Sequence, residues 1–313
     1  MARRGRRKGR PIHGWLALDK PRGLTSSRVV EEVRRITGAA KAGHAGTLDP
    51  LATGVLAVAF GEATKTVAHV MAASKHYRFT LRFGEERDTD DAEGAVTATS
   101  GLRPTAAEIE AALPAFVGEV EQVPPAYAAV KVDGERAYDL ARRGEAVALA
   151  PRRVRIDELR LLAMPDPDRA EFEMVSGRGA YVRAVARDLG RGLGCLAHVE
   201  ALRRTRVGPF RSEDAVSLEA LARLVEDDAL PQALVSMAAA LDDLPAFALT
   251  EPQATRLRAG QRVRIAPGLI TGGGGGQHPG AEPGVVRATA AGRLVALARL
   301  EDAELCPLRV FNP

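Results

Sequence analysis

The chain contains few cysteines, few aromatic residues and no long apolar run. Of its 313 residues, two are cysteines and 4% are aromatic. Cys195 and Cys306 lie far apart and form no C-x-x-C pair, which argues against a disulfide framework or structural zinc site and indicates a reducing compartment. No apolar run approaches the ~18 residues of a membrane span, and no apolar segment of a secretory signal follows the basic N-terminus. We therefore expect a cytoplasmic protein.

The motifs of several enzyme classes are also missing. The six histidines form no H-E-x-x-H pattern, and the acidic run RDTDDAEG (87–94) lacks the twelfth-position Glu of an EF-hand, so we expect it to be a solvated turn. No G-x-G-x-x-G follows a strand, and no Lys-Ser or Lys-Thr follows the five glycines at 272–276, which we interpret as a flexible loop. No serine lies in G-x-S-x-G. The sequence predicts no cofactor and no metal.

Positive charge is concentrated at the N-terminus and in three internal clusters. The chain carries +4 overall, and MARRGRRKGR (1–10) alone carries +6, so the remainder sums to −2. Such a tail favours a polyanionic partner, although a disordered solubilising arm explains it equally well. Three clusters in a nearly neutral body favour nucleic acid over a set of solvated faces. They are Arg142 and Arg143; Arg152, Arg153 and Arg155; and Arg203, Arg204 and Arg206.

Hydrophobic spacing predicts a mixture of helices and strands. We expect helices over 26–37, 61–74 and 180–190, a capping box at Thr105 and Glu108, and strands over 51–60, 75–84, 154–162 and 170–176. The proline-bounded stretch 122–153 resembles an insertion that stands off the main body. A boundary is expected near 244–250, followed by one short helix and several short strands. The pattern favours an α+β body with a small β-rich appendage.

Asp49 stands out in the segment GHAGTLDPLATG (43–54), because a carboxylate is flanked there by apolar residues and glycines. A turn aspartate that binds local backbone amides would explain it. A functional carboxylate would explain it as well, as a nucleophile, a general base or an electrostatic stabiliser. Gly43, Gly46 and Gly54 favour the functional reading, because glycine allows something bulky to approach the backbone. From the residues alone, both readings stay open.

The segment around Asp49 resembles the central motif of the bacterial tRNA pseudouridine-55 synthases, the TruB family. Further motifs of that family follow in the same order and with matching gaps, from about residue 14 to 245. They are ALDKPRGLTS (17–26), KHYRFTLRFGEERDTDDAEG (75–94), GRGAYVRAVARDLG (177–190) and HVEALRRTRVGPF (198–210). Several motifs in one order are far more specific than any one of them.

The resemblance implies an isomerase that converts uridine 55 in the T arm of tRNA to pseudouridine, without cofactor or metal and with flipping of the target base. It implies Asp49 as the catalytic acid. The substrate-binding residues that it implies are Tyr77, Arg183, His44, Lys20 and Leu202. Without the resemblance, Arg183 would be read as a solvent-facing helix arginine, Tyr77 as a core aromatic and Lys20 as part of a surface salt bridge.

The resemblance also implies an organisation for the whole chain: the pseudouridine synthase fold, a mixed and mainly antiparallel sheet flanked by helices. We expect a disordered tail at 1–12, a catalytic domain at 13–245 with an RNA-gripping thumb at 122–153, and a PUA-like RNA-binding domain at 246–313. The expected partner is tRNA alone, with no membrane and no protein, bound by a monomer. The expected phosphate contacts are Arg142, Arg143, Arg152, Arg153, Arg203, Arg204 and Arg206.

Two rival functions remain open at this point. The same fold could serve as a tRNA-folding chaperone, with catalysis secondary. A carboxylate-dependent nucleosidase or glycosidase is the other rival, although such hydrolysis usually needs two acids and no motif places a second one beside Asp49.

Overall fold

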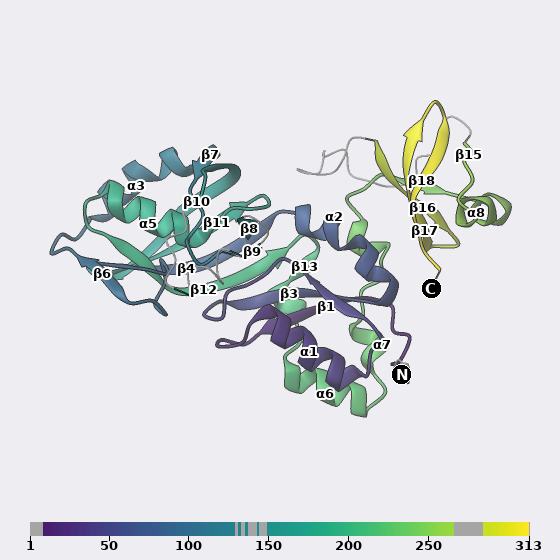
Figure 1. Cartoon of the computed structure of the whole chain (residues 1–313), viewed down its shortest axis with the longest axis horizontal. Coiled ribbons are helices and arrows are strands. Elements are labelled where there is room, and N and C mark those ends of the chain that lie inside the picture. The colour runs from purple at the N-terminus through teal and green to yellow at the C-terminus, as the bar shows by residue number, and fades with distance from the viewer. Residues whose placement is uncertain are drawn as a thin grey trace.

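The computed structural model describes residues 9–128, 131–132, 135–136, 143, 149–265 and 284–312. A nine-stranded sheet forms its centre, in the order β1-β3-β12-β4-β11-β10-β7, with β2 beside β3 and β13 beside β12 (Figure 1). All its pairings are antiparallel except β12 with β3, which is parallel and short. The strands are β1 (Gly14–Lys20), β2 (Ala42–Ala45), β3 (Thr53–Phe60), β4 (Lys75–Phe83), β7 (Gly118–Gln122), β10 (Arg152–Asp166), β11 (Arg169–Ser176), β12 (Ala197–Val207) and β13 (Phe210–Arg211).

Helices cover the sheet in two groups, one on each half. The helix predicted over 26–37 is confirmed, and it begins after the N-cap Thr25 and ends at Gly38 in the left-handed conformation. The capping box of Thr105 and Glu108 is also confirmed. The stretch predicted as helical at 61–74 forms a 3-10 helix followed by a short α-helix. The helices are α1 (Ser26–Thr37), η1 (Gly61–Thr66), α2 (Val67–Ala72), α3 (Ala106–Ala112), η2 (Leu113–Phe116), α5 (Val182–Gly192), η3 (Ser212–Asp214), α6 (Leu218–Glu226), α7 (Leu230–Ala233) and η4 (Ala239–Leu241).

The alternation of β4 determines how its half of the sheet packs. Tyr77, Phe79, Leu81 and Phe83 are buried, while the residues between them are exposed or half-buried. The buried side packs against α3 and α5 in one core, which includes Val185. On the other half, α1 and α6 pack against β1 and β3 in a separate core. The two halves meet where β12 pairs with β3 over only two residues of each strand.

A second, five-stranded sheet follows at the C-terminal end, in the order β14-β16-β17-β18-β15, and lies at the upper right of Figure 1. It shares a core with the first sheet, because Phe311 and Leu297 belong to the same buried cluster as Trp15. Arg287 on β16 joins the two parts by donating to the carbonyls of Ala238 and Leu244. Its elements are β14 (Ala246–Ala248), α8 (Glu251–Arg258), β15 (Val263–Arg264), β16 (Val285–Ala290), β17 (Arg293–Glu301) and β18 (Glu304–Val310).

Some predicted features lie partly or wholly outside the described residues. This is true of the glycine run 272–276, of Arg142 and of nearly half of the 122–153 insertion, in which β8 (Lys131–Val132) pairs with β9 (Glu135–Arg136). The end of the predicted tail is an exception, and there the prediction is wrong. Arg10 donates its backbone N–H to Gly38 at 2.7 Å and accepts from Ala40, so residues 10–12 are held against the end of α1.

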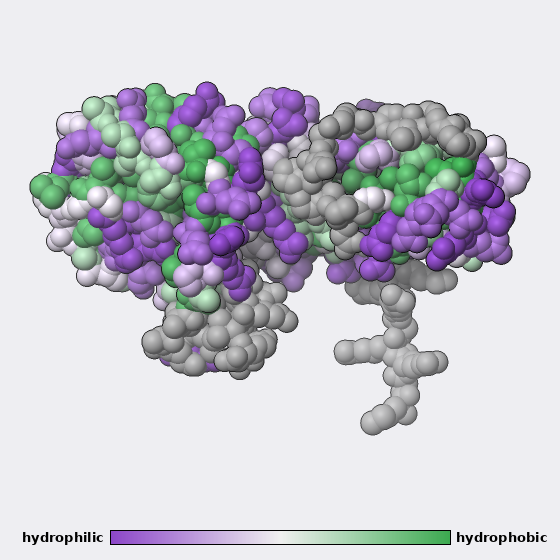
Figure 2. Space-filling view, turned by 90° about the horizontal axis from the view of Figure 1, so that it is seen from above, coloured by the Kyte–Doolittle hydropathy of each residue, from purple (hydrophilic) through white to green (hydrophobic). Residues whose placement is uncertain are grey.

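The surface is mixed in polarity. Figure 2 views the molecule from above Figure 1, and hydrophilic residues lie between hydrophobic ones across both lobes of this face. Among the described residues, no helix has the length and apolar character needed to cross a membrane.

Candidate active site

Asp49 lies in the loop between β2 and β3, and hydrogen bonds to the backbone hold this loop on both sides of it. Ser26 Oγ, in the first turn of α1, accepts from the backbone N–H of Leu48 at 2.8 Å and donates to its carbonyl at 3.0 Å. The Pro50 carbonyl accepts from the Gly23 backbone at 2.7 Å. Leu48 and Leu51 are buried in the core beside α5. The apolar residues around Asp49 therefore anchor the loop, and the carboxylate itself remains about one-third exposed.

Lys20, at the end of β1, binds the backbone of the same loop. Its ammonium donates to the carbonyls of Pro21, Pro50 and Ala52, at 2.9, 3.2 and 2.7 Å. The residue is 0% exposed, so the surface salt bridge considered above is wrong. Burial lowers the pKa of Lys20 to about 8, and the nearby Asp49 carboxylate opposes this shift. Lys20 thus holds the backbone that carries Asp49.

The Asp49 carboxylate is paired with Arg183 of α5. Arg183 Nη2 donates to Oδ1 at 3.1 Å, and Nε lies 2.9 Å from Oδ2 in an ion-pair contact that lacks hydrogen-bond alignment. The same guanidinium donates to the carbonyls of Thr89 and Tyr127, at 2.8 and 3.0 Å. The Arg183 side chain is 4% exposed, which contradicts the solvent-facing reading. These contacts fix the direction in which the carboxylate points.

The acidic turn at 87–94 lies behind this pair, and the prediction that it is solvated is wrong. Asp90 and Asp91 are 6% and 4% exposed. Asp91 Oδ2 lies 3.7 Å from Arg183 Nε, and Asp90 Oδ2 accepts from Arg187 Nη1 at 3.2 Å. Burial raises the pKa of Asp90 to about 6, although Arg187 opposes the shift. Two arginines on one face of α5 therefore bury a turn that its sequence marks as polar.

A cavity of about 340 Å³ opens beside Asp49, and we refer to it as the Asp49 cavity. This volume lies within the ~300–1,000 Å³ range of small-molecule sites. Tyr77 and Leu202 line it from β4 and β12 and lie on the same face of the sheet. Of the other predicted site residues, Asp49, Arg152, Arg183 and Arg204 also line it. The structure thus brings together side chains from four elements and the Asp49 loop.

Arg204 does not lie on the surface, so its predicted contact with an RNA phosphate is wrong. It is 1% exposed, and it donates to the carbonyls of Val55 and Gly46 at 2.9 and 3.0 Å. The structure also explains two of the glycines. A Cβ at Gly54, where φ is +95°, would lie 2.2 Å from the backbone carbonyl of Arg204, and Gly46 has a φ of +90°, which favours glycine. Gly54 therefore makes room for the neighbouring strand, whereas we had expected a bound molecule there.

His44 lies on β2 next to this arginine. Its Nδ1 is buried, without a hydrogen-bond partner in the part of the chain that the structure describes. Burial lowers the pKa of His44, and the charge of Arg204 lowers it further, so the ring is neutral at pH 7.

The remaining candidate phosphate contacts are spread over several surfaces. Arg143, Arg152 and Arg153 are exposed. Arg203 points to the opposite face of the sheet from the cavity, where its guanidinium binds both oxygens of Asp19 at 3.0 and 2.9 Å. Arg206 donates to the Gly208 carbonyl at 2.7 Å. For these residues, RNA contact stays a prediction.

Three further residues of the cavity were not identified from the sequence. Tyr181 lies next to Arg183, and burial raises the pKa of its hydroxyl. Arg178 lies at the entry to α5. Lys75, two positions before Tyr77, donates to the carbonyls of Met71 and Ala73, and burial lowers its pKa to about 8. Spacing on β4 could have identified Lys75, because residues two apart on a strand share a face.

The site holds polar groups suited to a sugar or a base. Within the described ranges, no group of three or more His, Cys, Asp or Glu side chains is arranged to hold a metal ion. A carboxylate fixed by a guanidinium, at the edge of a cavity with an aromatic wall, can stabilise positive charge or attack an electrophilic carbon.

Comparison with known proteins places the chain in one family. The model for "TruB family pseudouridylate synthase (N terminal domain)" matches residues 34–182, and that for "tRNA pseudouridylate synthase B C-terminal domain" matches 183–242. The chain is 52% identical to tRNA pseudouridine synthase B of Bradyrhizobium diazoefficiens, covering 98% of this chain and 88% of that protein. It is 51% identical to the protein of the same name from Gluconacetobacter diazotrophicus, covering 98% and 99%.

Solved structures agree on the fold. A chain in a structure titled as an H/ACA RNP bound to a substrate RNA containing 2′-deoxyuridine superimposes with a TM-score of 0.73 and 25% identity, covering 96% of this chain and 86% of the other. A Cbf5-Nop10-Gar1 complex gives a TM-score of 0.72 with 26% identity, covering 96% and 84%. The predicted pseudouridine synthase fold is confirmed, and the C-terminal sheet agrees with a PUA-like domain. The chain belongs to the TruB family of pseudouridylate synthases and is therefore an isomerase.

Proposed function

We propose that this tRNA pseudouridine synthase acts on uridine 55 in the T arm of tRNA, with Asp49 as the essential acid and with the target nucleotide flipped into the Asp49 cavity. The single observation that carries the proposal is the Asp49–Arg183 pair, held at the edge of a cavity between β4 and β12. The curated relatives bear the name tRNA pseudouridine synthase B over nearly the whole chain. Family motifs and local geometry thus agree on one site.

The reaction exchanges one bond to the sugar for another. The N1–C1′ bond of uridine breaks, the uracil turns within the cavity, and C5 bonds to C1′. The proton that leaves C5 is balanced by the one that N1 gains, so atoms and charge are conserved. Asp49 acts beside the ribose throughout, as an ionised carboxylate. Arg183 holds it there through two contacts and keeps its rotamer fixed.

The walls of the cavity position the base. Tyr77 supplies the aromatic ring on which the uracil stacks, and Leu202 supplies an apolar contact beside it. The nucleotide must leave its stack to reach them, at a cost of about a few kcal/mol. His44, which is neutral and adjacent to the loop, lies near the space that the nucleotide vacates. Lys20 keeps the Asp49 loop in place without contacting the substrate.

The rest of the chain binds the tRNA. In this proposal, residues 13–245 form the catalytic domain with the thumb at 122–153, and 246–313 form the RNA-binding domain. Arg143, Arg152 and Arg153 contact phosphates, as do Arg142 and the basic residues within 1–8, which lie outside the described residues. Arg203 and Arg206 are weaker candidates, because both already bind groups of the protein.

The test is tritium release from tRNA labelled at C5 of uridine. The wild type should release tritium at position 55 without strand loss, and Asp49→Asn should lower the single-turnover rate at least about 10⁴-fold while tRNA still binds. Equal rates for the two proteins would end the assignment of Asp49. Free uracil among the products would instead indicate the rival nucleosidase activity. Binding with no tritium release from the wild type would indicate the chaperone.

A further inference from the structure

Positive charge exceeds negative charge around the Asp49 cavity. Among the described residues that line it, Asp49 is the single carboxylate, and it already pairs with Arg183. The cations that line the cavity are Lys75, Arg152, Arg178, Arg183 and Arg204. A cavity with this balance of charge attracts an anionic group of a ligand more strongly than a neutral one.

Lys75 differs from Lys20 in how completely the protein uses its ammonium group. A lysine ammonium has three N–H donors. Lys20 gives all three to backbone carbonyls and is not among the residues that line the cavity. Lys75 lines the cavity and donates to two carbonyls, those of Met71 and Ala73. It is 5% exposed, and no carboxylate of the described residues forms an ion pair with it, so one donor of a buried cation is left for a bound group.

The residues next to Lys75 also have polar groups that the protein does not use. Lys75 on β4 pairs in register with Ser176, the last residue of β11. Ser176 is 0% exposed, and its hydroxyl has no hydrogen-bond partner in the described part of the chain. Arg178, two positions further, is exposed and lines the cavity, and within the described ranges its guanidinium has neither an ion pair nor a hydrogen bond. Unused donors from β4 and from the end of β11 therefore lie close together.

We propose that Lys75 and Arg178 form a phosphate subsite of the Asp49 cavity, which binds a backbone phosphate of the flipped uridine. The phosphate is the anionic group of a uridine nucleotide at neutral pH, so two cations without carboxylate partners favour it over the sugar and the base. This inference rests on the proposed function, because it takes the target nucleotide to lie in this cavity. Asp49 then acts at the ribose, while the subsite holds the chain that carries it.

The two cations suit different parts of this task. Two backbone carbonyls hold Lys75, so its charge has a fixed position, whereas the exposed Arg178 can offer two parallel N–H donors to a phosphate. The segment that carries Arg178 is itself anchored, since Gly177 donates its backbone N–H to the carbonyl of Arg155 at 2.9 Å. Burial, together with the charges of Arg204 and Arg178, lowers the pKa of Lys75 to about 8, so the ammonium remains mostly charged at pH 7.

The test neutralises the phosphate and the two cations in one cycle. Full-length tRNA is assembled with a neutral methylphosphonate in place of the phosphate on the 5′ side or on the 3′ side of uridine 55, one at a time. The wild type should bind one of these two tRNAs about 10–100-fold more weakly than the unmodified tRNA. In the variant with both Lys75→Met and Arg178→Met, the same methylphosphonate should change the Kd less than about 3-fold.

Two variants serve as matched controls. Lys20→Met removes a lysine whose donors are all used within the protein, and Arg78→Met removes an exposed arginine on the opposite face of β4. Both should keep the full loss of affinity that the methylphosphonate causes. The subsite is overturned if the double variant loses as much affinity as the wild type, or if neither methylphosphonate weakens binding by the wild type.

A second variant covers the case in which the double variant does not fold, as judged by circular dichroism. Arg178→Met alone then takes its place, because Arg178 is exposed and has no partner in the described protein to lose. It should reduce the loss caused by the methylphosphonate at least about 3-fold, and an unchanged loss would overturn the subsite. Failure of the proposed function would show separately, as wild-type tritium release from Asp49→Asn, because the cycle measures only Kd.

Discussion

Adjacent residues of β4 show two different uses of charge on the two faces of one sheet. Tyr77 faces the cavity and lies opposite Arg204, whereas Arg78 faces the other side and lies opposite Arg203. Around the cavity, Lys75, Arg183 and Arg204 are almost completely buried beside the partly exposed Asp49. On the other face, which we call the open face, the side chains of Arg78 and Arg203 are 63% and 40% exposed and pair with Glu173 and Asp19.

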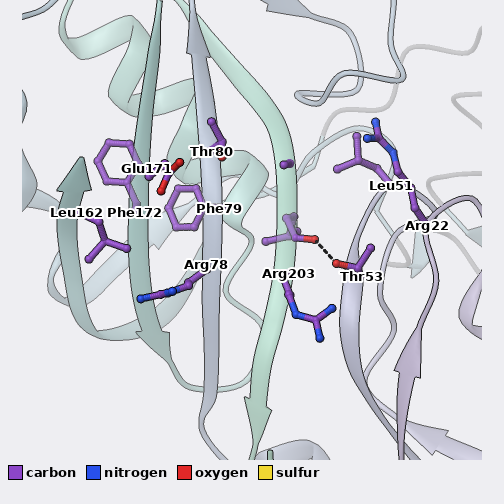
Figure 3. Close-up of a pocket in the computed structure, with 12 residues that line it drawn as sticks. Arg22, Leu51, Thr53, Arg78, Phe79, Thr80, Leu162, Glu171, Phe172 and Arg203 are labelled. Atoms are coloured by element: carbon purple, nitrogen blue, oxygen red, sulfur yellow. Dashed lines mark hydrogen bonds between the residues drawn. The ribbon is translucent and has the colours of Figure 1, made fainter. Parts of the chain in front are cut away.

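The open face is also hollowed, but its charges are arranged differently. A cavity of about 260 Å³ opens there beside β4 and β12. Figure 3 shows Arg78, Arg203 and Glu171 among the residues that line it. Each charge there has a partner across the strands or water around it, so removing one costs little. On the cavity face, removing a partner leaves a buried charge unpaired. The effect of an ion pair on the free energy of unfolding therefore depends more on how exposed the pair is than on the distance between its charged atoms.

The most severe test of this contrast is Arg183→Met. It leaves Asp91 buried and without the nearest positive charge, so the free energy of unfolding should fall by about 3–5 kcal/mol. Urea denaturation measures the change, and circular dichroism confirms that the variant is folded in water. A loss below about 1 kcal/mol, the range of surface ion pairs, would remove the distinction between the two faces.

The next effect concerns pH and Asp90. Its pKa of about 6 in the folded protein exceeds the unfolded value of 3.8, so its stabilising contribution is full below about pH 4 and is lost as pH rises through 6. Asp90→Asn lacks this titration. The stability of the wild type relative to Asp90→Asn should therefore fall by about 2–3 kcal/mol between pH 4 and pH 7. Urea titrations of both proteins at several pH values measure it, and parallel curves would contradict it.

A smaller effect is expected for Lys20→Met. The substitution leaves three carbonyls without their donor but also removes a desolvated cation, so unfolding should become easier by about 1–3 kcal/mol. Because the loop that carries Asp49 loses its anchor, the single-turnover rate should fall about 10–100-fold with tRNA affinity unchanged. Equal loss in affinity would mean that Lys20 contacts the RNA.

The smallest effect belongs to the open face. Glu173→Gln removes the partner of both Arg78 and Arg160, which lie 2.9 and 3.0 Å from its oxygens. The free energy of unfolding should change by less than about 1 kcal/mol, and the difference should vanish in 1 M salt. Thermal unfolding at low and high salt checks this. A salt-independent loss would show that the open face is desolvated in the same way as the cavity.

The sequence predicted features that depend on local pattern. The helix over 26–37, the capping box of Thr105 and Glu108 and the strand over 75–84 are set by residues within a few positions of each other, and all three are confirmed. The acidic turn was mispredicted because its burial depends on α5, which lies more than 90 positions away. The local composition of a segment does not show which distant helix will bury it.

The site was predicted in part, for a similar reason. Motif resemblance named Asp49 and Arg183, but spacing alone could not have paired residues so far apart in the chain. Arg204 was misplaced because the run Arg203–Arg206 was read as one basic patch. Strand alternation would have separated it, since Arg204 shares a face with Leu202 and Arg203 does not. The prediction used the residue types of this run and did not consider to which face of the strand each side chain points.

The core shared by the two sheets has a consequence for how the chain is made. Trp15 and Phe311 belong to one buried cluster, yet almost the entire polypeptide separates them. At bacterial elongation rates, on the order of tens of seconds pass between the synthesis of these two residues. During that interval, the part of this core that the C-terminal residues will cover remains exposed to other molecules in the cell. A chaperone that binds exposed apolar surface should therefore be able to bind this part of the nascent chain until its last strand has emerged.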